Sequence, residues 1–180
     1  MLKLSAVVVL ALTISGCSTF AVPRYSADAE TVSALRSMGE VKVNVGPFNN
    51  GPGDQSKSGV LTCRAFGPVK TPNAEAYSEY VRKALVSELM MANLYAEKAP
   101  VELTGTLDKL NFSSNSGKWV SALTLRSSNG NSLSVEDTYK FTTSFVGETA
   151  CTQTALAGLG AVQELIKKAV RDPAFPKLLK

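Results

Sequence analysis

The amino-acid sequence predicts an α+β fold, a two-layer sandwich in which a mixed or antiparallel sheet of about four to five strands carries two helices on one face. Short segments of alternating apolar and polar residues, with an Asn-Gly turn between two of them, indicate strands and a hairpin. Two longer segments, 74–93 and 150–171, repeat apolar residues at helical spacing. One apolar sheet face and two amphipathic helices can bury one another, so we expect a single domain over residues 40–180.

The segment before this domain has few apolar anchors. We interpret residues 17–39 as a tether, in which residues 28–38 can form a short helix. Residues 41–45 then alternate strictly between apolar and polar side chains and predict the first strand. The Gly46-Pro47 pair is expected to end that strand.

Residues 49–59 are rich in glycine, proline and small polar residues, which predicts a flexible loop. Residues 60–66 are a candidate for a second short strand, with Cys63 on its apolar side. The first long helix follows at 74–93, with a cap at Thr71 or Asn73. Asn93 suits the left-handed backbone conformation that often ends a helix.

A three-stranded meander is predicted after this helix. The apolar alternation that begins at Val101 changes phase near Asp108, as a β-bulge would cause. Asn129-Gly130 predicts a tight hairpin in which both turn residues have positive φ. The returning strand keeps one apolar phase as far as Phe145.

The second long helix is predicted to start near Thr149 and to stop at Asp172-Pro173. Its residues repeat at a spacing of three or four, which places one stripe of them toward the sheet. The expected stripe consists of Ala155, Leu159, Val162, Ile166 and Ala169.

The chain begins like a secretory signal peptide. Lys3 supplies a positive charge, residues 4–14 form an uncharged and mostly apolar run, and small residues follow. The apolar run is roughly ten residues long, which is too short to span a bilayer as a permanent helix. We therefore interpret residues 1–16 as a signal peptide that is removed.

Residues 13–17, Thr-Ile-Ser-Gly-Cys, resemble the lipobox of bacterial lipoproteins. The resemblance implies cleavage before Cys17 and a lipid on its thiol. In lipoproteins of enteric bacteria, an aspartate directly after the lipidated cysteine resembles a signal for retention in the inner membrane. This chain has Ser18 at that position instead. The resemblance therefore implies an anchor in the outer membrane, with the chain facing the periplasm.

If Cys17 carries the lipid, the two remaining cysteines, Cys63 and Cys151, form an even pair in an oxidising compartment. We expect a disulfide between them, and two buried free thiols are the alternative. The chain contains no histidine, the commonest general base and metal ligand, so we expect neither a metal nor a cofactor. The formal charge of +4 is spread without a dense basic cluster, which argues against nucleic acid.

The order of elements resembles that of YajG-type lipoproteins, the LPS-assembly lipoprotein and the amino-terminal domain of TolB. Residues 43–49, Val-Asn-Val-Gly-Pro-Phe-Asn, are similar to the strand and Pro-Phe turn that open TolB-like and CsgG-type lipoprotein domains. The resemblance covers roughly residues 40–175 and contains no catalytic motif, so it implies a fold rather than an activity.

Four groups of residues invite a chemical interpretation. Gly158-Leu159-Gly160 lacks the third glycine of a nucleotide-binding loop, and residues 114–118 have the wrong spacing for a Ser-Lys nucleophile. Asp108 and Asp137 would have to face one another to act as a carboxylate pair. The aromatic residues of the meander can line a lipid groove or belong to the core, and they are Trp119, Tyr139, Phe141 and Phe145.

The sequence therefore predicts an accessory or assembly factor of the cell envelope rather than an enzyme. We expect it to bind an envelope protein or a glycolipid through an edge of its sheet or through its long loop. The alternative is a lipid or transport auxiliary with a small hydrophobic pocket between the sheet and the helices.

Overall fold

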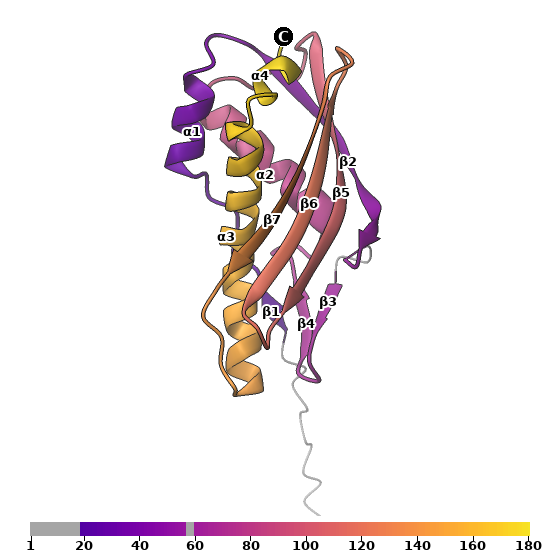
Figure 1. Ribbon diagram of the computed structural model, residues 1–180, viewed down its shortest axis with the longest axis vertical. Coiled ribbons are helices and arrows are strands. Elements are labelled where there is room, and N and C mark those ends of the chain that lie inside the picture. Colours follow the sequence, from indigo (N-terminus) through magenta and orange to yellow (C-terminus); the bar gives the residue numbers. More distant parts are fainter. Residues whose placement is uncertain (1–18, 57–59) are drawn as a thin grey trace, which may run out of the picture.

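The computed structural model describes residues 19–56 and 60–180 and confirms an α+β fold. Its larger sheet consists of β2 (Val43–Asp54), β5 (Val101–Ser113), β6 (Lys118–Ser127) and β7 (Ser132–Lys140). These strands lie in the order β2-β5-β6-β7 (Figure 1). β2 pairs in parallel with β5, whereas the other pairs are antiparallel, so the sheet is mixed.

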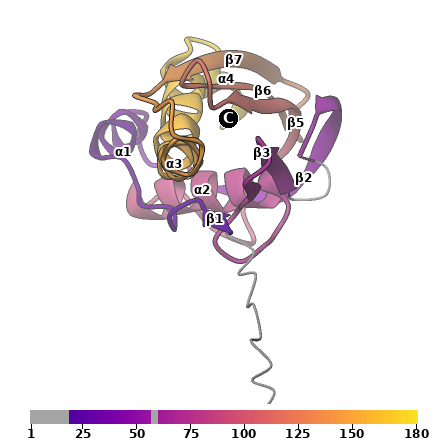
Figure 2. The same ribbon diagram turned by 90° about the horizontal axis from the view of Figure 1, so that it is seen from below.

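Both long helices, α2 (Tyr77–Met91) and α3 (Gly147–Arg171), lie on the same face of this sheet, as predicted. Figure 2 shows the sheet curving around them. α3 packs against β6 and β7, and α2 packs against β2 and β5, which closes a continuous apolar core. Two short helices, α1 (Ala29–Arg36) and α4 (Phe175–Leu178), pack against the long helices.

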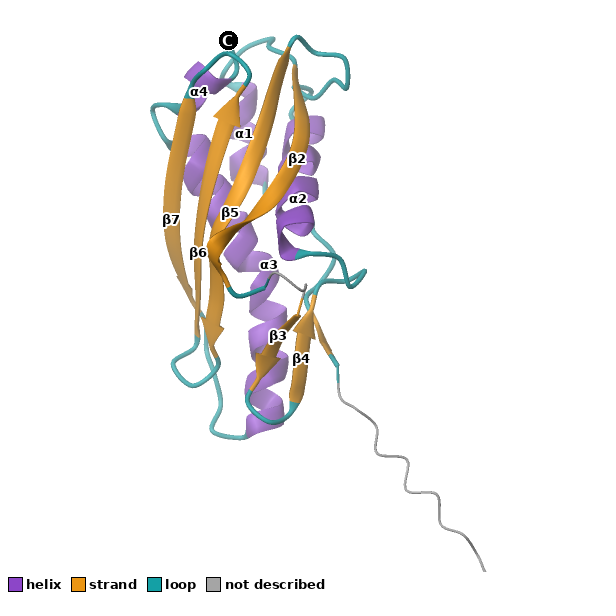
Figure 3. Cartoon of the chain, turned by 90° about the vertical axis from the view of Figure 1, so that its right-hand side faces the viewer, coloured by secondary structure: helices purple, strands orange, loops and turns teal. Residues whose placement is uncertain are grey.

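A second, smaller sheet lies beside the N-terminal half of α3 (Figure 3). It consists of β1 (Phe20–Ala21), β3 (Val60–Cys63) and β4 (Gly67–Lys70), in the order β1-β4-β3. The predicted strand at 60–66 is therefore shorter than expected. Arg64 adopts a φ of +50° and turns the chain into β4.

The described part of the segment interpreted as a tether, residues 19–39, packs into the domain. Phe20 and Val22 are buried in the core, and β1 pairs with β4. The predicted short helix is present as α1, which buries Val32 and Leu35 against α2 and α3. The domain thus includes this segment from Phe20 onward, because a few well-placed apolar residues are enough to anchor a segment that already has a sheet edge to pair with.

The first predicted strand does not end at Gly46-Pro47, and the first part of the predicted flexible loop, residues 49–54, is strand. β2 continues through Gly46-Pro47 to Asp54, with register shifts against β5 after Val45 and after Asn50. A Cβ at Gly51 would lie 2.6 Å from the Cα of Asp108, so only glycine permits this approach of the two backbones. The glycines and prolines here mark bulges in a strand rather than a loop.

The meander confirms the predicted bulge and corrects the predicted turn. The register of β5 against β6 shifts between Leu107 and Lys109, on either side of Asp108. At the β6–β7 hairpin only Gly130 has a positive φ, +92°, so the turn is not the type with two left-handed residues. A longer turn followed by one left-handed glycine makes the same reversal.

The returning strand ends at Lys140, so the prediction that it continues to Phe145 is wrong. A loop carries the chain from there to α3, and Phe145 is fully exposed in it. The helices are closer to expectation. Asn93 has a φ of +62° just after α2, and α3 stops at Arg171 before Asp172. In the predicted stripe of α3, Leu159 is only half-buried.

Candidate functional site

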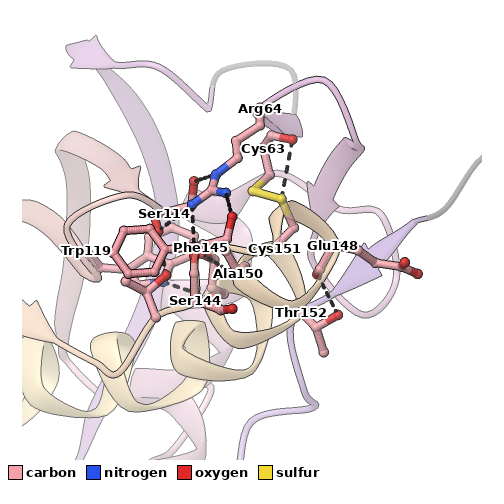
Figure 4. The surroundings of a disulfide bond; sticks show 12 residues. Cys63, Arg64, Ser114, Trp119, Ser144, Phe145, Glu148, Ala150, Cys151 and Thr152 are labelled. Atoms are coloured by element: carbon pink, nitrogen blue, oxygen red, sulfur yellow. Dashed lines mark hydrogen bonds between the residues drawn. A yellow bond between two sulfur atoms is a disulfide. The ribbon is translucent and has the colours of Figure 1, made fainter.

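The predicted disulfide between Cys63 and Cys151 is present and confirmed. The two Cα atoms are 5.8 Å apart, within the range that a disulfide requires. Both cysteines are completely buried, and the bond joins the end of β3 to the first turns of α3 (Figure 4). It therefore fixes the small sheet against the N-terminal end of α3.

Arg64 follows the first cysteine and holds three loops together (Figure 4). Its guanidinium donates to the hydroxyl and the carbonyl oxygen of Ser114 at 3.1 and 3.2 Å. It also donates to the carbonyl oxygens of Ser144 at 3.2 Å and Phe145 at 3.3 Å. Four of the five N–H groups of the side chain are thus occupied, so Arg64 is a brace between loops rather than a free anion-binding group.

The same loops expose apolar side chains. Phe66 is 48% exposed, Val146 is 63% exposed and Phe145 is fully exposed. The ring of Phe66 lies directly over Gly147, which leaves no room for a Cβ there, and this contact brings the two loops together. We call Phe66, Phe145 and Val146 the apolar tip.

The sequence pattern missed the apolar tip because it placed Phe66 and Phe145 in strands. The available signals were the glycines that follow: Gly67-Pro68 comes after Phe66, and Gly147 comes after Val146. Beside the tip lies a hollow of about 340 Å³. It is lined by Arg64, Asn115, Thr143, Ser144 and Phe145.

The other aromatic residues of the meander do not line this hollow. Trp119 is buried, with its ring centroid 5.0 Å from that of Phe112 and 6.0 Å from that of Tyr77. Its indole N–H donates to the carbonyl oxygen of Thr154 at 3.0 Å. Tyr139 and Phe141 are partly buried and pack against the core. The core interpretation is therefore correct for Trp119 and wrong for Phe145.

The structure does not bring Asp108 and Asp137 together. Asp108 accepts a hydrogen bond from Thr124 at 2.6 Å on the face of the sheet away from the helices. Asp137 lies on the helix-covered face, 3.7 Å from Lys168 of α3. The two carboxylates occupy opposite faces and do not form a pair of the kind that cleaves glycosides.

Gly158-Leu159-Gly160 lies inside α3, not in a loop. A Cβ at Gly158 would lie 2.8 Å from Val22, and one at Gly160 would lie 2.6 Å from the hydroxyl of Tyr139. Close packing of the helix therefore accounts for both glycines. Of residues 114–118, the first four form the β5–β6 turn, where the Ser114 hydroxyl accepts a hydrogen bond from Arg64, and Lys118 begins β6.

A buried carboxylate connects α1 to α2. Glu88 is fully buried and accepts hydrogen bonds from the Tyr25 hydroxyl at 2.6 Å and from the Asp28 N–H at 2.8 Å. Burial raises the pKa of Glu88 above its usual value, and these two hydrogen bonds offset only part of the effect. The pKa of Tyr25 is also raised, first by burial and then by its bond to Glu88. These groups hold the segment before α1 in place.

Comparison with known proteins gives no family assignment. No protein-family model and no curated protein matches the chain.

Within the part of the chain that the structure describes, no cluster of three or more acidic or cysteine side chains could hold a metal ion. None of the helices in that part has both the length and the apolar character needed to cross a bilayer. Cys17 and the segment predicted as a signal peptide lie outside the described residues. The strongest candidate site within them is thus the disulfide-braced end with its apolar tip.

Proposed function

We propose that the chain is a non-catalytic lipoprotein of the bacterial cell envelope. It is anchored in the outer membrane through a lipid on Cys17, faces the periplasm and binds an envelope protein or a glycolipid. The observation that carries this proposal is the Thr-Ile-Ser-Gly-Cys sequence at 13–17, which ends three residues before β1 begins at Phe20.

The disulfide supports the proposal in two ways. A buried disulfide that closes a separation of 88 residues is typical of proteins that fold in an oxidising compartment such as the periplasm. It also pairs Cys63 with Cys151, so Cys17 is the one cysteine of the chain left over for acylation. The resemblance to envelope lipoproteins points in the same direction.

The packing supports a binding role over a ligand pocket in the core. The space between the sheet and α3, where a hydrophobic ligand would sit, is filled by Trp119 and its neighbours. In the described chain, β2 forms one edge of the larger sheet, and its bulges and two prolines give that edge an irregular outline. Such an edge resists indiscriminate strand pairing but can be matched by a specific partner.

Replacing Cys17 tests the anchor. Cys17→Ser should leave the chain at precursor size and prevent its labelling with a fatty acid in cells, because the acyl chain requires the thiol. Ser18→Ala changes the adjacent residue but keeps the cysteine, and it should be processed and labelled normally. Normal processing and fatty-acid labelling of the Cys17→Ser variant would contradict the proposal.

A further inference from the structure

The apolar tip is an exposed surface formed by two loops that several contacts hold together. Phe66 lies in the β3–β4 turn, and Phe145 with Val146 lies in the loop before α3. The loops are joined by the buried disulfide, by the Arg64 hydrogen bonds and by the contact of Phe66 with Gly147. Exposed apolar side chains on two loops that are fastened to one another form a patch of the kind that indicates an interaction site.

β1 lies at the same end of the molecule. β1 runs parallel to β4, with Phe20 opposite Val69. Following both strands backward leads along β4 to Gly67 and then to Phe66 of the apolar tip. Figure 1 and Figure 3 both show β1, the β3–β4 turn and the start of α3 at this end.

The lipid on Cys17 must therefore attach close to the apolar tip. Cys17 precedes Phe20 by three residues, and an extended chain spans at most about 3.3–3.6 Å per residue. The thiol-bearing residue thus lies within roughly 11 Å of Phe20. So short a connection brings this end of the domain to the surface of the bilayer that holds the lipid.

Charge at this end also suits a membrane surface. Lys118 at the start of β6 pairs with Lys140 at the end of β7, and both side chains are exposed. Glu148, in the first turn of α3, is an exposed acidic residue near the tip. The two lysines lie at the same end as the apolar tip. Peripheral membrane proteins combine cationic and apolar side chains in this way to bind a bilayer with anionic head groups.

We propose that the apolar tip inserts into the interface of the membrane that carries the Cys17 lipid. The domain then stands on the bilayer through Phe66, Phe145 and Val146, with the β6–β7 turn pointing away from it. This inference rests on the proposed lipid anchor and adds a second contact that fixes the orientation of the domain. The lipid provides most of the affinity for the membrane, and the apolar tip fixes the orientation of the domain on it.

The test places a fluorescent label at each end of the mature, lipidated chain. Val146→Cys puts a thiol on the tip, and Ser132→Cys puts one at the far end of β7, about 27 Å along the strand from Lys140. Cys63 and Cys151 are in the disulfide and Cys17 carries the lipid, so an environment-sensitive dye reacts only at the new cysteine. The labelled proteins are reconstituted into vesicles of equal parts phosphatidylcholine and phosphatidylglycerol, with and without nitroxide-labelled lipid.

The inference predicts that the dye at position 146 shifts to the blue and loses most of its emission to the nitroxide, whereas the dye at 132 does neither. Phe66→Ser with Phe145→Ser should reduce the quenching at 146 toward the level at 132 while the protein still floats with the vesicles. Both replaced side chains are exposed, so their removal leaves the core intact.

Three results would overturn the inference. Flotation with equal quenching at 146 and 132 would reject the orientation but leave the lipid anchor standing. A blue shift at 146 without nitroxide quenching would show that a second copy of the chain covers the tip. A chain that does not float at all would reject both the inference and the proposed anchor.

Discussion

Three neighbouring residues in one turn perform three different tasks. Cys63 bonds to Cys151, Arg64 ties the turn to two other loops, and Phe66 is held out toward solvent. The left-handed φ of Arg64 is what reverses the chain and separates the buried side chain from the exposed one. A positive φ is unfavourable for arginine, so the backbone is strained at this residue. The hydrogen bonds of the Arg64 side chain compensate for that strain.

Loss of the disulfide should weaken the fold. In the chain-entropy model a loop of 88 residues contributes about 4–5 kcal/mol to the free energy of unfolding, as an upper figure. Cys63→Ala with Cys151→Ala should therefore lower the denaturant midpoint markedly. The exposed neighbour Thr62→Ala should leave it almost unchanged. An unaltered midpoint in the double variant would show that the bond does not stabilise the fold.

Glu88 should make stability depend on pH. Its folded pKa is raised by burial above the usual 4.5, so the folded state binds more protons than the unfolded state. The contribution of Glu88 to stability is then fully present below about pH 4.5 and is lost as the pH rises through the folded pKa. Glu88→Gln removes this group, and denaturation at several pH values should show a flatter dependence in the variant. Identical slopes in the two proteins would contradict the prediction.

The elements differ in how far their sequences determine them. α2 and α3 were predicted because each repeats apolar residues over more than three turns, which no strand can imitate. The bulge in β5 was predicted because it reverses the phase of a strictly alternating pattern. These signals are contained within one segment, so the sequence alone is sufficient to find them.

β2 was predicted only in part because its second half depends on a partner strand. The prolines and glycines of residues 46–53 favour a loop when the segment is considered alone. In the fold, β5 supplies hydrogen-bonding partners and Asp108 lies so close that only Gly51 fits opposite it. A contact between segments more than fifty residues apart decides the conformation, and nothing in the local sequence reports it.

β1 gives a direct test at this scale. Phe20 is buried between the small sheet and α3, although its segment was expected to be a tether. Phe20→Ala should lower the free energy of unfolding by about 3 kcal/mol through lost burial and a cavity. Ala21, the next residue, is exposed, and Ala21→Ser should change stability little. Equal stability of the two variants would show that the segment is not part of the fold.

For the whole molecule, the sequence predicted the layers but not the apolar tip. The α+β class and the placement of both helices on one face follow from patterns that run along single elements. The apolar tip is assembled from residue 66 and residues 145–146, which approach one another through the disulfide and Arg64. The membrane role that we propose for the tip also depends on the pairing of β1 with β4, which places Phe20 at the same end of the molecule.

The most direct test of the proposed anchor is the intact mass of the protein extracted from bacterial membranes, without reduction. We predict a chain that starts at Cys17, carries a diacylglyceryl group and fatty acid on that residue, and contains the Cys63–Cys151 disulfide. Alkylation before reduction should add no mass, because all three thiols are occupied. A mass corresponding to the full chain from Met1, or to a chain with an unmodified Cys17, would contradict a lipid-anchored role.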